Sequence, residues 1–127
     1  MHYYTRFFAA LLLAPSLVLA QDIKIDIASN DEDTASAVQS ASLVFSIDAS
    51  TIPKPQDYIA AARADYRRIL TALYSRGYYG GTISILIDGR EAAGIAPLEA
   101  PSKIGQISLY VDPGPSFTFG NATVAPL

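Results

Sequence analysis

Residues 59–87 read IAAARADYRRILTALYSRGYYGGTISILI, a pattern that predicts a long helix followed, after a glycine turn, by a strand. Its first part places apolar residues three and four positions apart, which predicts one buried stripe along a helix. The stripe consists of Ile59, Ala62, Tyr66, Ile69, Leu70, Leu73 and Tyr74. Polar residues such as Asp65 and Arg68 fall off the stripe and predict the solvated face. If the stripe covers a core, Leu70→Ala should cost about 2–5 kcal/mol of stability.

The ends of this helix carry matching signals. Pro55 suits a first turn, because a residue there needs no hydrogen-bonding N–H. Asp57 near the start and Arg76 near the end complement the helix dipole. Gly77 predicts a left-handed stop.

After the glycine turn, residues 82–87 alternate as a strand. Ile83, Ile85 and Ile87 share one face, and Thr82, Ser84 and Leu86 share the other. A one-sided helix that leads directly into a one-sided strand predicts a helix packed on a sheet.

The N-terminus has the pattern of a secretory signal. Met1–Arg6 carries one arginine, Phe7–Leu19 is almost wholly apolar, and small residues precede Gln21. The apolar run is shorter than the about 20 residues that span a bilayer. We expect residues 1–20 to be removed, which leaves an exported chain with no membrane span.

Charge and cysteine content exclude several classes. Without Arg6, the 9 basic residues fall to 8 against 12 acidic ones, a net charge of −4. An acidic chain does not favour nucleic acid, which needs clustered basic residues. The chain has 0 cysteines, so a disulfide scaffold is excluded and an apolar core must hold the fold.

The remaining segments complete the predicted order. Alternation predicts strands at 21–28 and 104–112, and apolar residues three and four positions apart predict a shorter helix at 34–47. The acidic cluster at 31–33 lacks the spacing of a calcium loop and is interpreted as helix capping. The loop at 90–103 is expected to cover a sheet edge or make another contact.

The predicted fold class is therefore α+β, with elements in the order strand, helix, helix, strand, strand. We expect a three-stranded mixed sheet with two antiparallel helices on one face. A sharp turn at Asp112-Pro113-Gly114-Pro115 ends this unit, and an extended segment with Phe117, Phe119 and Val124 follows it. The expected organisation is a signal peptide at 1–20, one domain at 21–115 and the start of a second, truncated repeat at 116–127.

Two motifs in this order resemble a known family. Gly77-Tyr78-Tyr79-Gly80 ends the long helix, and VDPGPSFTFG spans residues 111–120. Both are similar to the hallmarks of polypeptide-transport-associated (POTRA) domains. The sequences of the helix and of the strand after it most resemble those in the outer-membrane subunit of the translocation and assembly module. The resemblance covers roughly residues 23–125.

The resemblance implies a POTRA-like fold in the periplasm, within an outer-membrane protein (autotransporter) assembly factor. Its implied partners are outer-membrane assembly subunits and unfolded outer-membrane polypeptides. The chain has no barrel, so membrane insertion itself is not expected of it.

Catalysis is not expected from these residues. The single histidine, His2, lies in the predicted signal, and no nucleophile, phosphate or dinucleotide motif occurs. We therefore expect no catalytic residues, cofactor or metal. The favoured function is pairing of an extended polypeptide with an open sheet edge, known as β-augmentation.

The candidate residues follow from that function. Residues 82–87 are the candidate edge, with Thr82, Ser84 and Leu86 as the peptide contacts. Tyr78 and Tyr79 are candidates for partner contact, although one of them is expected to fasten the helix end. Asp112, Pro113, Gly114 and Pro115 are interpreted as an interdomain hinge. The alternative is a secreted small-ligand or glycan-binding domain that uses the tyrosines Tyr66, Tyr74, Tyr78, Tyr79 and Tyr110 and the 90–103 loop.

Overall fold

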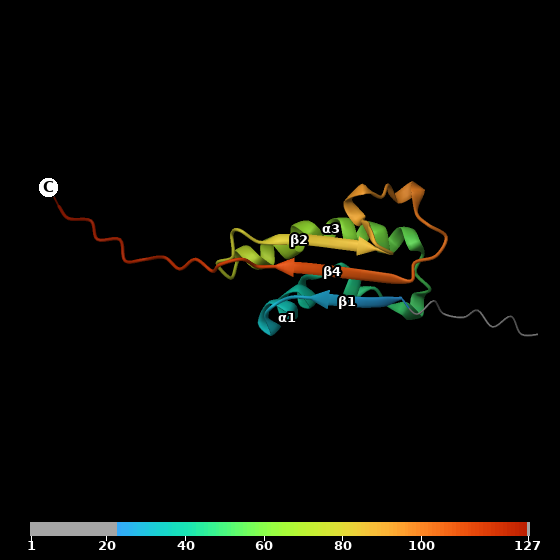
Figure 1. Cartoon of the computed structure of the whole chain (residues 1–127), viewed down its shortest axis with the longest axis horizontal. Coiled ribbons are helices and arrows are strands. Elements are labelled where there is room, and N and C mark those ends of the chain that lie inside the picture. The colour runs from blue at the N-terminus through green and yellow to red at the C-terminus, as the bar shows by residue number, and fades with distance from the viewer. Residues whose placement is uncertain (1–22, 127) are drawn as a thin grey trace, which may run out of the picture.

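The structure, a computed structural model, describes residues 23–126 (Figure 1). Its helices and strands are β1 (Lys24–Ala28), α1 (Glu32–Ala41), α2 (Leu43–Ser46), α3 (Pro55–Tyr74), β2 (Thr82–Ile87), β3 (Arg90–Glu91) and β4 (Gln106–Asp112). Short 3-10 turns occupy Ala49–Thr51, Ala92–Gly94 and Pro97–Glu99. The predicted signal peptide at 1–20 lies outside the described residues.

The strands form one mixed sheet in the order β1-β4-β2-β3. β1 runs parallel to β4, with Ile25 opposite Ile107, and β2 runs antiparallel to β4, with Ile85 opposite Leu109. The α+β class and the mixed sheet are confirmed. The prediction of three strands is wrong, because Arg90 and Glu91 fold back onto the end of β2 as a fourth strand.

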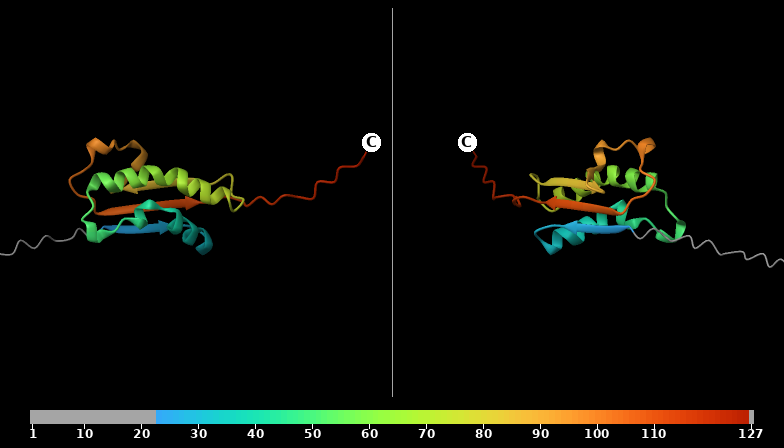
Figure 2. Two further views of the ribbon diagram at one scale, coloured as in Figure 1. Left: turned by 180° about the vertical axis from the view of Figure 1, so that it is seen from behind. Right: turned by 45° about the vertical axis from the view of Figure 1, so that its right-hand side comes forward.

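The helices cover one face of the sheet, as the view from behind shows (Figure 2). The core lies between these two layers. Ile85, Ile87, Ile107 and Leu109 are fully buried on the helix side, so the alternation predicted for both strands is confirmed. We call the opposite side of the sheet the open face.

The long helix α3 ends as its sequence predicts. Gly77 has φ +84°, and the N–H of Tyr78 donates to the Leu73 carbonyl at 3.0 Å. The N–H of Gly77 donates to the Tyr74 carbonyl at the same distance. These two bonds satisfy the last carbonyls of the helix and turn the chain toward β2.

The buried stripe of α3 is displaced from the predicted one. Ile59, Ala62, Ile69 and Leu73 are buried as expected. Leu70 is only partly buried and lies outside the core cluster, and Tyr74 is 44% exposed. The stripe also includes Tyr58, Ala61 and Asp65, all of which are buried.

Asp65 was predicted to face solvent, but its side chain is 0% exposed. Its carboxylate accepts hydrogen bonds from the Ser42 hydroxyl and from the backbone N–H groups of Leu43, at 2.7 Å, and Val44, at 3.2 Å. These groups lie at the N-terminus of α2. The predicted helix at 34–47 is therefore two helices, because Ser42 has extended backbone (ψ 130°) where Asp65 takes the freed donors.

The predicted loop at 90–103 packs against the molecule. Ala92 and Ile95 are buried, and the Arg63 guanidinium donates to the Ile95 carbonyl at 2.8 Å. The segment thereby ties β3 to α3, as expected of a loop that covers an edge.

The chain leaves the domain after a single bridge between Tyr78 and Ser116. Residues 117–126 contain no helix or strand and extend away from the sheet (Figure 1). Phe119 is 99% exposed and Val124 is 89% exposed. The start of a second repeat at 116–127 stays a prediction.

Candidate functional site

The backbone of β2 alternates between its two neighbours. The N–H of Ile85 donates to the Glu91 carboxylate at 3.2 Å, and the carbonyl of Ile85 accepts from the Tyr66 hydroxyl at 3.3 Å. Both backbone groups of Ile85 therefore point away from β4. Alternation along the strand then directs the backbone groups of Thr82, Ser84 and Leu86 toward β4.

Thr82, Ser84 and Leu86, the predicted peptide contacts, therefore offer side chains rather than backbone groups. They pair across the sheet with Asp112, Tyr110 and Ser108 and lie on the open face. The prediction that residues 82–87 form the outermost strand is wrong, because β3 lies outside them. Whether these residues contact a peptide stays a prediction.

Glu91 and Tyr66 close the middle of the β2 edge. The Tyr66 hydroxyl donates to the Glu91 carboxylate, which also accepts from the Ser84 hydroxyl at 2.7 Å. Burial, followed by the hydrogen bond to Glu91, raises the pKa of Tyr66 to about 12. The same hydrogen bond, with smaller contributions from Ser84 and Ile85, lowers the pKa of Glu91. At neutral pH the pair is a carboxylate and a neutral phenol, the forms that hold this contact.

The end of the β2 edge is closed by backbone. Arg90 pairs with Ile87, and Glu91 with Leu86, after the turn at Asp88 and Gly89. The outward backbone groups of Ile85 and Ile87 are therefore bonded within the domain. Among the outward-facing residues of β2, only Ile83 is left open to another strand. An incoming strand would have to displace the Glu91 cap.

β1 forms the opposite edge of the sheet and is outermost over its whole length. The N–H of Lys24 donates to the Gly105 carbonyl at 3.1 Å, so the backbone of Lys24 faces β4. By alternation, the backbone groups of Ile25 and Ile27 point away from the sheet. Within residues 23–126, no hydrogen bond uses these outward groups.

A groove of about 460 Å³ runs beside this edge, between β1 and α1. Its lining residues are Ile25, Ile27, Glu32, Ala35, Ser36, Gln39 and Phe45. The two isoleucines and Phe45 are only partly buried, so the groove offers apolar surface directly next to the free backbone groups. An added strand would find both hydrogen-bonding groups and an apolar seat at this edge.

The open face of β1 carries one charge of each sign. Lys24 Nζ lies 3.5 Å from Asp26 Oδ2, and the Gln106 side chain donates to the same carboxylate at 2.8 Å. The Lys24 side chain is 70% exposed and that of Asp26 is 43% exposed. Because the pair is so exposed, it adds little to the stability of the domain.

The acidic cluster at 31–33 caps α1, as its sequence predicts. Asp31 accepts hydrogen bonds from the hydroxyl of Thr34, at 2.7 Å, and from its N–H, at 3.0 Å. The hydroxyl contact and then the N–H contact lower the pKa of Asp31. Among residues 23–126 no group of three or more histidine, cysteine or acidic side chains is placed to hold a metal ion.

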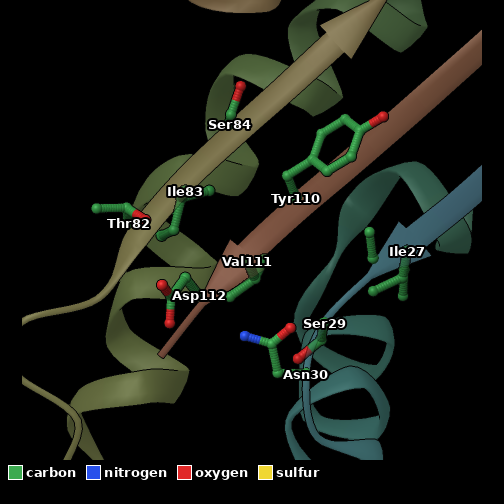
Figure 3. Close-up of a pocket in the computed structure, with 10 residues that line it drawn as sticks. Ile27, Ser29, Asn30, Thr82, Ile83, Ser84, Tyr110, Val111 and Asp112 are labelled. Atoms are coloured by element: carbon green, nitrogen blue, oxygen red, sulfur yellow. The ribbon is translucent and has the colours of Figure 1, made fainter. Parts of the chain in front are cut away.

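A shallow pocket of about 400 Å³ lies where β1 parts from β4, at the end of the sheet where β2 begins (Figure 3). It is lined by Ile27, Ala28, Ser29, Asn30, Thr82, Ile83, Ser84, Tyr110, Val111 and Asp112. Tyr110 is the single tyrosine among these lining residues. Of the tyrosines named for a glycan site, Tyr66 contacts the 90–103 loop through Glu91 and the N–H of Ala93, whereas Tyr110 lies in this pocket at the other end of β2, so the named residues do not form one site.

Tyr78 and Tyr79 have different surroundings. Tyr78 is partly buried against the core and bridges Ser116, whereas Tyr79 is 52% exposed. The ring of Tyr79 lies 5.4 Å from that of Tyr74 and 6.2 Å from that of Phe117, measured between centroids. Tyr78 therefore fastens the helix end, as expected of one member of this pair, and contact of Tyr79 with a partner stays a prediction.

The predicted hinge at 112–115 packs tightly on the glycine turn before β2. Asp112 Oδ1 accepts from the N–H of Gly114 at 3.0 Å, and Gly114 has φ +67°. A Cβ at Gly114 would lie 3.2 Å from the Gly80 carbonyl oxygen. This contact fixes the direction in which the chain leaves the sheet, while motion at this turn stays a prediction.

Glu91 and Asp65 are structural groups that were not predicted from the sequence. The position of Glu91 could have been predicted, because a two-residue Asp-Gly turn indicates that the residues after it pair back onto the strand before it. Asp65 had no comparable signal, since a buried acid within a helix looks like any solvated one.

Comparisons with protein-family models, with curated proteins and with solved structures find no match to this chain. None of the helices among residues 23–126 is long and apolar enough to cross a bilayer.

Proposed function

We propose that this chain is an exported protein-binding module that engages extended polypeptides by β-augmentation, with β1 as the receiving edge. The supporting observation is that the outward N–H and C=O groups of Ile25 and Ile27 meet no partner within residues 23–126. A half-satisfied strand edge favours pairing with another strand, because unpaired backbone groups gain hydrogen bonds there.

The choice of edge follows from the contrast between the two sides of the sheet. The β2 edge is closed by β3, Glu91 and Tyr66, so an incoming strand would pair with β1 rather than with the predicted strand. The groove along β1 would receive the apolar side chains of an alternating client strand, next to Phe45.

The biological setting rests on the resemblance of residues 77–80 and 111–120 to POTRA domains. On that basis we propose a scaffold module in the periplasm, part of an outer-membrane protein assembly factor. Its partners would be unfolded outer-membrane polypeptides or another assembly subunit. The proposal assigns no catalytic step to the chain.

The test compares two variants at one position. Ile25→Ala removes the side chain, whereas Ile25→Pro removes the same packing and the outward N–H as well. Proline is tolerated in an edge strand where its missing N–H faces solvent. The probe is a fluorescent decapeptide of alternating valine and threonine with a lysine at each end, and the readout is fluorescence anisotropy.

We expect the peptide to bind wild type and Ile25→Ala but to lose at least about tenfold in affinity for Ile25→Pro, since one backbone pair is blocked. Equal binding by the two variants would contradict pairing at β1. Ile83→Pro, at the remaining outward position of β2, is the matched control and should bind as wild type does.

One observation supports a second candidate, a small-ligand or glycan-binding domain. The pocket in Figure 3 combines the Tyr110 ring with polar groups of Ser29, Asn30 and Asp112, a composition suited to sugar hydroxyls. Tyr110→Ala would abolish binding on a glycan array under this candidate and would leave peptide binding at β1 unchanged.

A further inference from the structure

We propose that two copies of this chain pair edge to edge through β1, antiparallel, with Ile25 of one copy opposite Ile25 of the other. The inference deepens the proposed function, on which it rests, because it names a second copy of the chain as an occupant of the open edge. It is carried by the direction of the backbone groups of β1 and by the charges on its open face.

The hydrogen-bonding pattern suits such a pair. Outward backbone groups belong to the odd-numbered residues of β1, because Lys24 bonds toward β4. In an antiparallel ladder, residues of a closely spaced pair exchange both N–H···O bonds. With Ile25 at the centre, Ile25 forms such a pair with Ile25 of the second copy. Ile23 of each copy likewise pairs with Ile27 of the other.

Charge selects this register among its neighbours. With Ile25 at the centre, Lys24 lies directly opposite Asp26 of the second copy, twice by symmetry. Shifting the centre to residue 24 would place Lys24 opposite Lys24, and shifting it to residue 26 would place Asp26 opposite Asp26. Like charges directly opposite each other destabilise a strand pair. Of these three registers, the sequence Lys24-Ile25-Asp26 therefore favours the one centred on Ile25.

The helix side of the edge is compatible with a second copy. The partly buried Ile25 and Ile27 side chains of each copy would meet at the centre of the joined sheet, above the two β1–α1 grooves. On α1 the groove wall includes Ala35 and Ser36, small side chains that let a second helix approach. The contact is small, and we expect a reversible dimer rather than a permanent one.

Sedimentation equilibrium of the purified chain and its charge variants tests the proposal. Lys24→Asp and Asp26→Lys each place like charges opposite one another in the homodimer. Both residues are exposed, so neither change disturbs the core, and circular dichroism confirms that each variant is folded. We expect wild type to dimerise and each single variant to weaken dimerisation by about tenfold or more.

Complementation distinguishes pairing from a general charge effect. An equimolar mixture of Lys24→Asp with Asp26→Lys restores opposite charges across the two-fold axis, and so does the double variant K24D/D26K. We expect both to dimerise as wild type does. A monomeric wild-type chain at millimolar concentration would overturn the proposal, as would single variants that dimerise normally or a mixture that fails to dimerise.

The decapeptide assay separates this inference from the proposed function. It is run on Lys24→Asp, whose edge is expected to be free of a second copy. If wild type is monomeric and the peptide still binds, self-pairing is wrong and the proposed function stands. If the peptide binds neither Lys24→Asp nor Asp26→Lys, the proposed function is wrong.

Discussion

Replacing Asp65 with alanine should be among the most damaging single changes in this domain. Its carboxylate is 0% exposed and accepts from the Ser42 hydroxyl and from the N–H groups of Leu43 and Val44. In Asp65→Ala these three donors at the start of α2 lose their acceptor. A buried donor left without a partner costs about 1–3 kcal/mol.

The expected loss of stability is smaller than the sum of three such costs. Removing the carboxylate also removes the cost of burying a charge, and water reaches the Leu43 N–H, which is only partly buried. We therefore expect Asp65→Ala to lower the free energy of unfolding by about 3–4 kcal/mol. Because domains of this kind hold only about 5–15 kcal/mol, a loss of this size is a large fraction of the total stability.

Urea unfolding followed by circular dichroism measures the loss, and Asp57→Ala is the matched control. Asp57 is an exposed acid on the same helix whose carboxylate accepts one bond, from the Lys54 N–H at 2.7 Å. Its removal should cost about 1 kcal/mol, the usual value of an N-terminal cap. A loss below 1 kcal/mol for Asp65→Ala, or equal losses for the two variants, would refute the role assigned to Asp65.

Three further predictions test the core, the β2 edge and the helix stop. Ile69→Ala should cost about 2–5 kcal/mol and Leu70→Ala about 1 kcal/mol, because only Ile69 is fully buried; equal losses in urea unfolding would contradict the observed stripe. Because the pKa of Tyr66 rises from 10.0 to about 12 on folding, the folded state holds this proton more tightly, and stability should fall as pH rises through that window. The fall should be larger in wild type than in Tyr66→Phe by about 1–2 kcal/mol, discounted for partial exposure, and parallel pH profiles would refute the contact. Gly77→Ala should cost about 2 kcal/mol or more, since Gly77 has φ +84° and a Cβ there would lie 2.6 Å from a backbone oxygen, whereas Gly80→Ala, with open space around it, should be close to neutral by thermal unfolding.

Local patterns predicted the elements of this fold because each depends on residues near in sequence. The stripe of α3, the stop at Gly77 and the alternation of β2 all follow from spacing or backbone conformation. The displacement of the stripe from Leu70 and Tyr74 toward Asp65 did not follow, because it depends on contacts distant in sequence, such as those of Asp65 with the start of α2.

The candidate edge shows the same limit. Residues 82–87 have the composition of an edge strand, but edge status is a property of the whole sheet. It was lost when Arg90 paired with Ile87 across the Asp88-Gly89 turn, which the local sequence indicates, and when Tyr66, from the helix before the strand, met Glu91 at Ile85, which it does not indicate. The open edge is β1 instead, and its sequence had indicated only a half-buried strand.

The open β1 edge is tested most directly by amide hydrogen exchange, measured residue by residue in the dilute chain and again with the decapeptide bound. We expect fast exchange at Ile25 and Ile27 in the free chain and marked slowing on binding. The Ile85 amide, which Glu91 already holds, should be protected in both states. Protection of Ile25 and Ile27 in the free monomer, or slowing on binding confined to β2, would contradict the account.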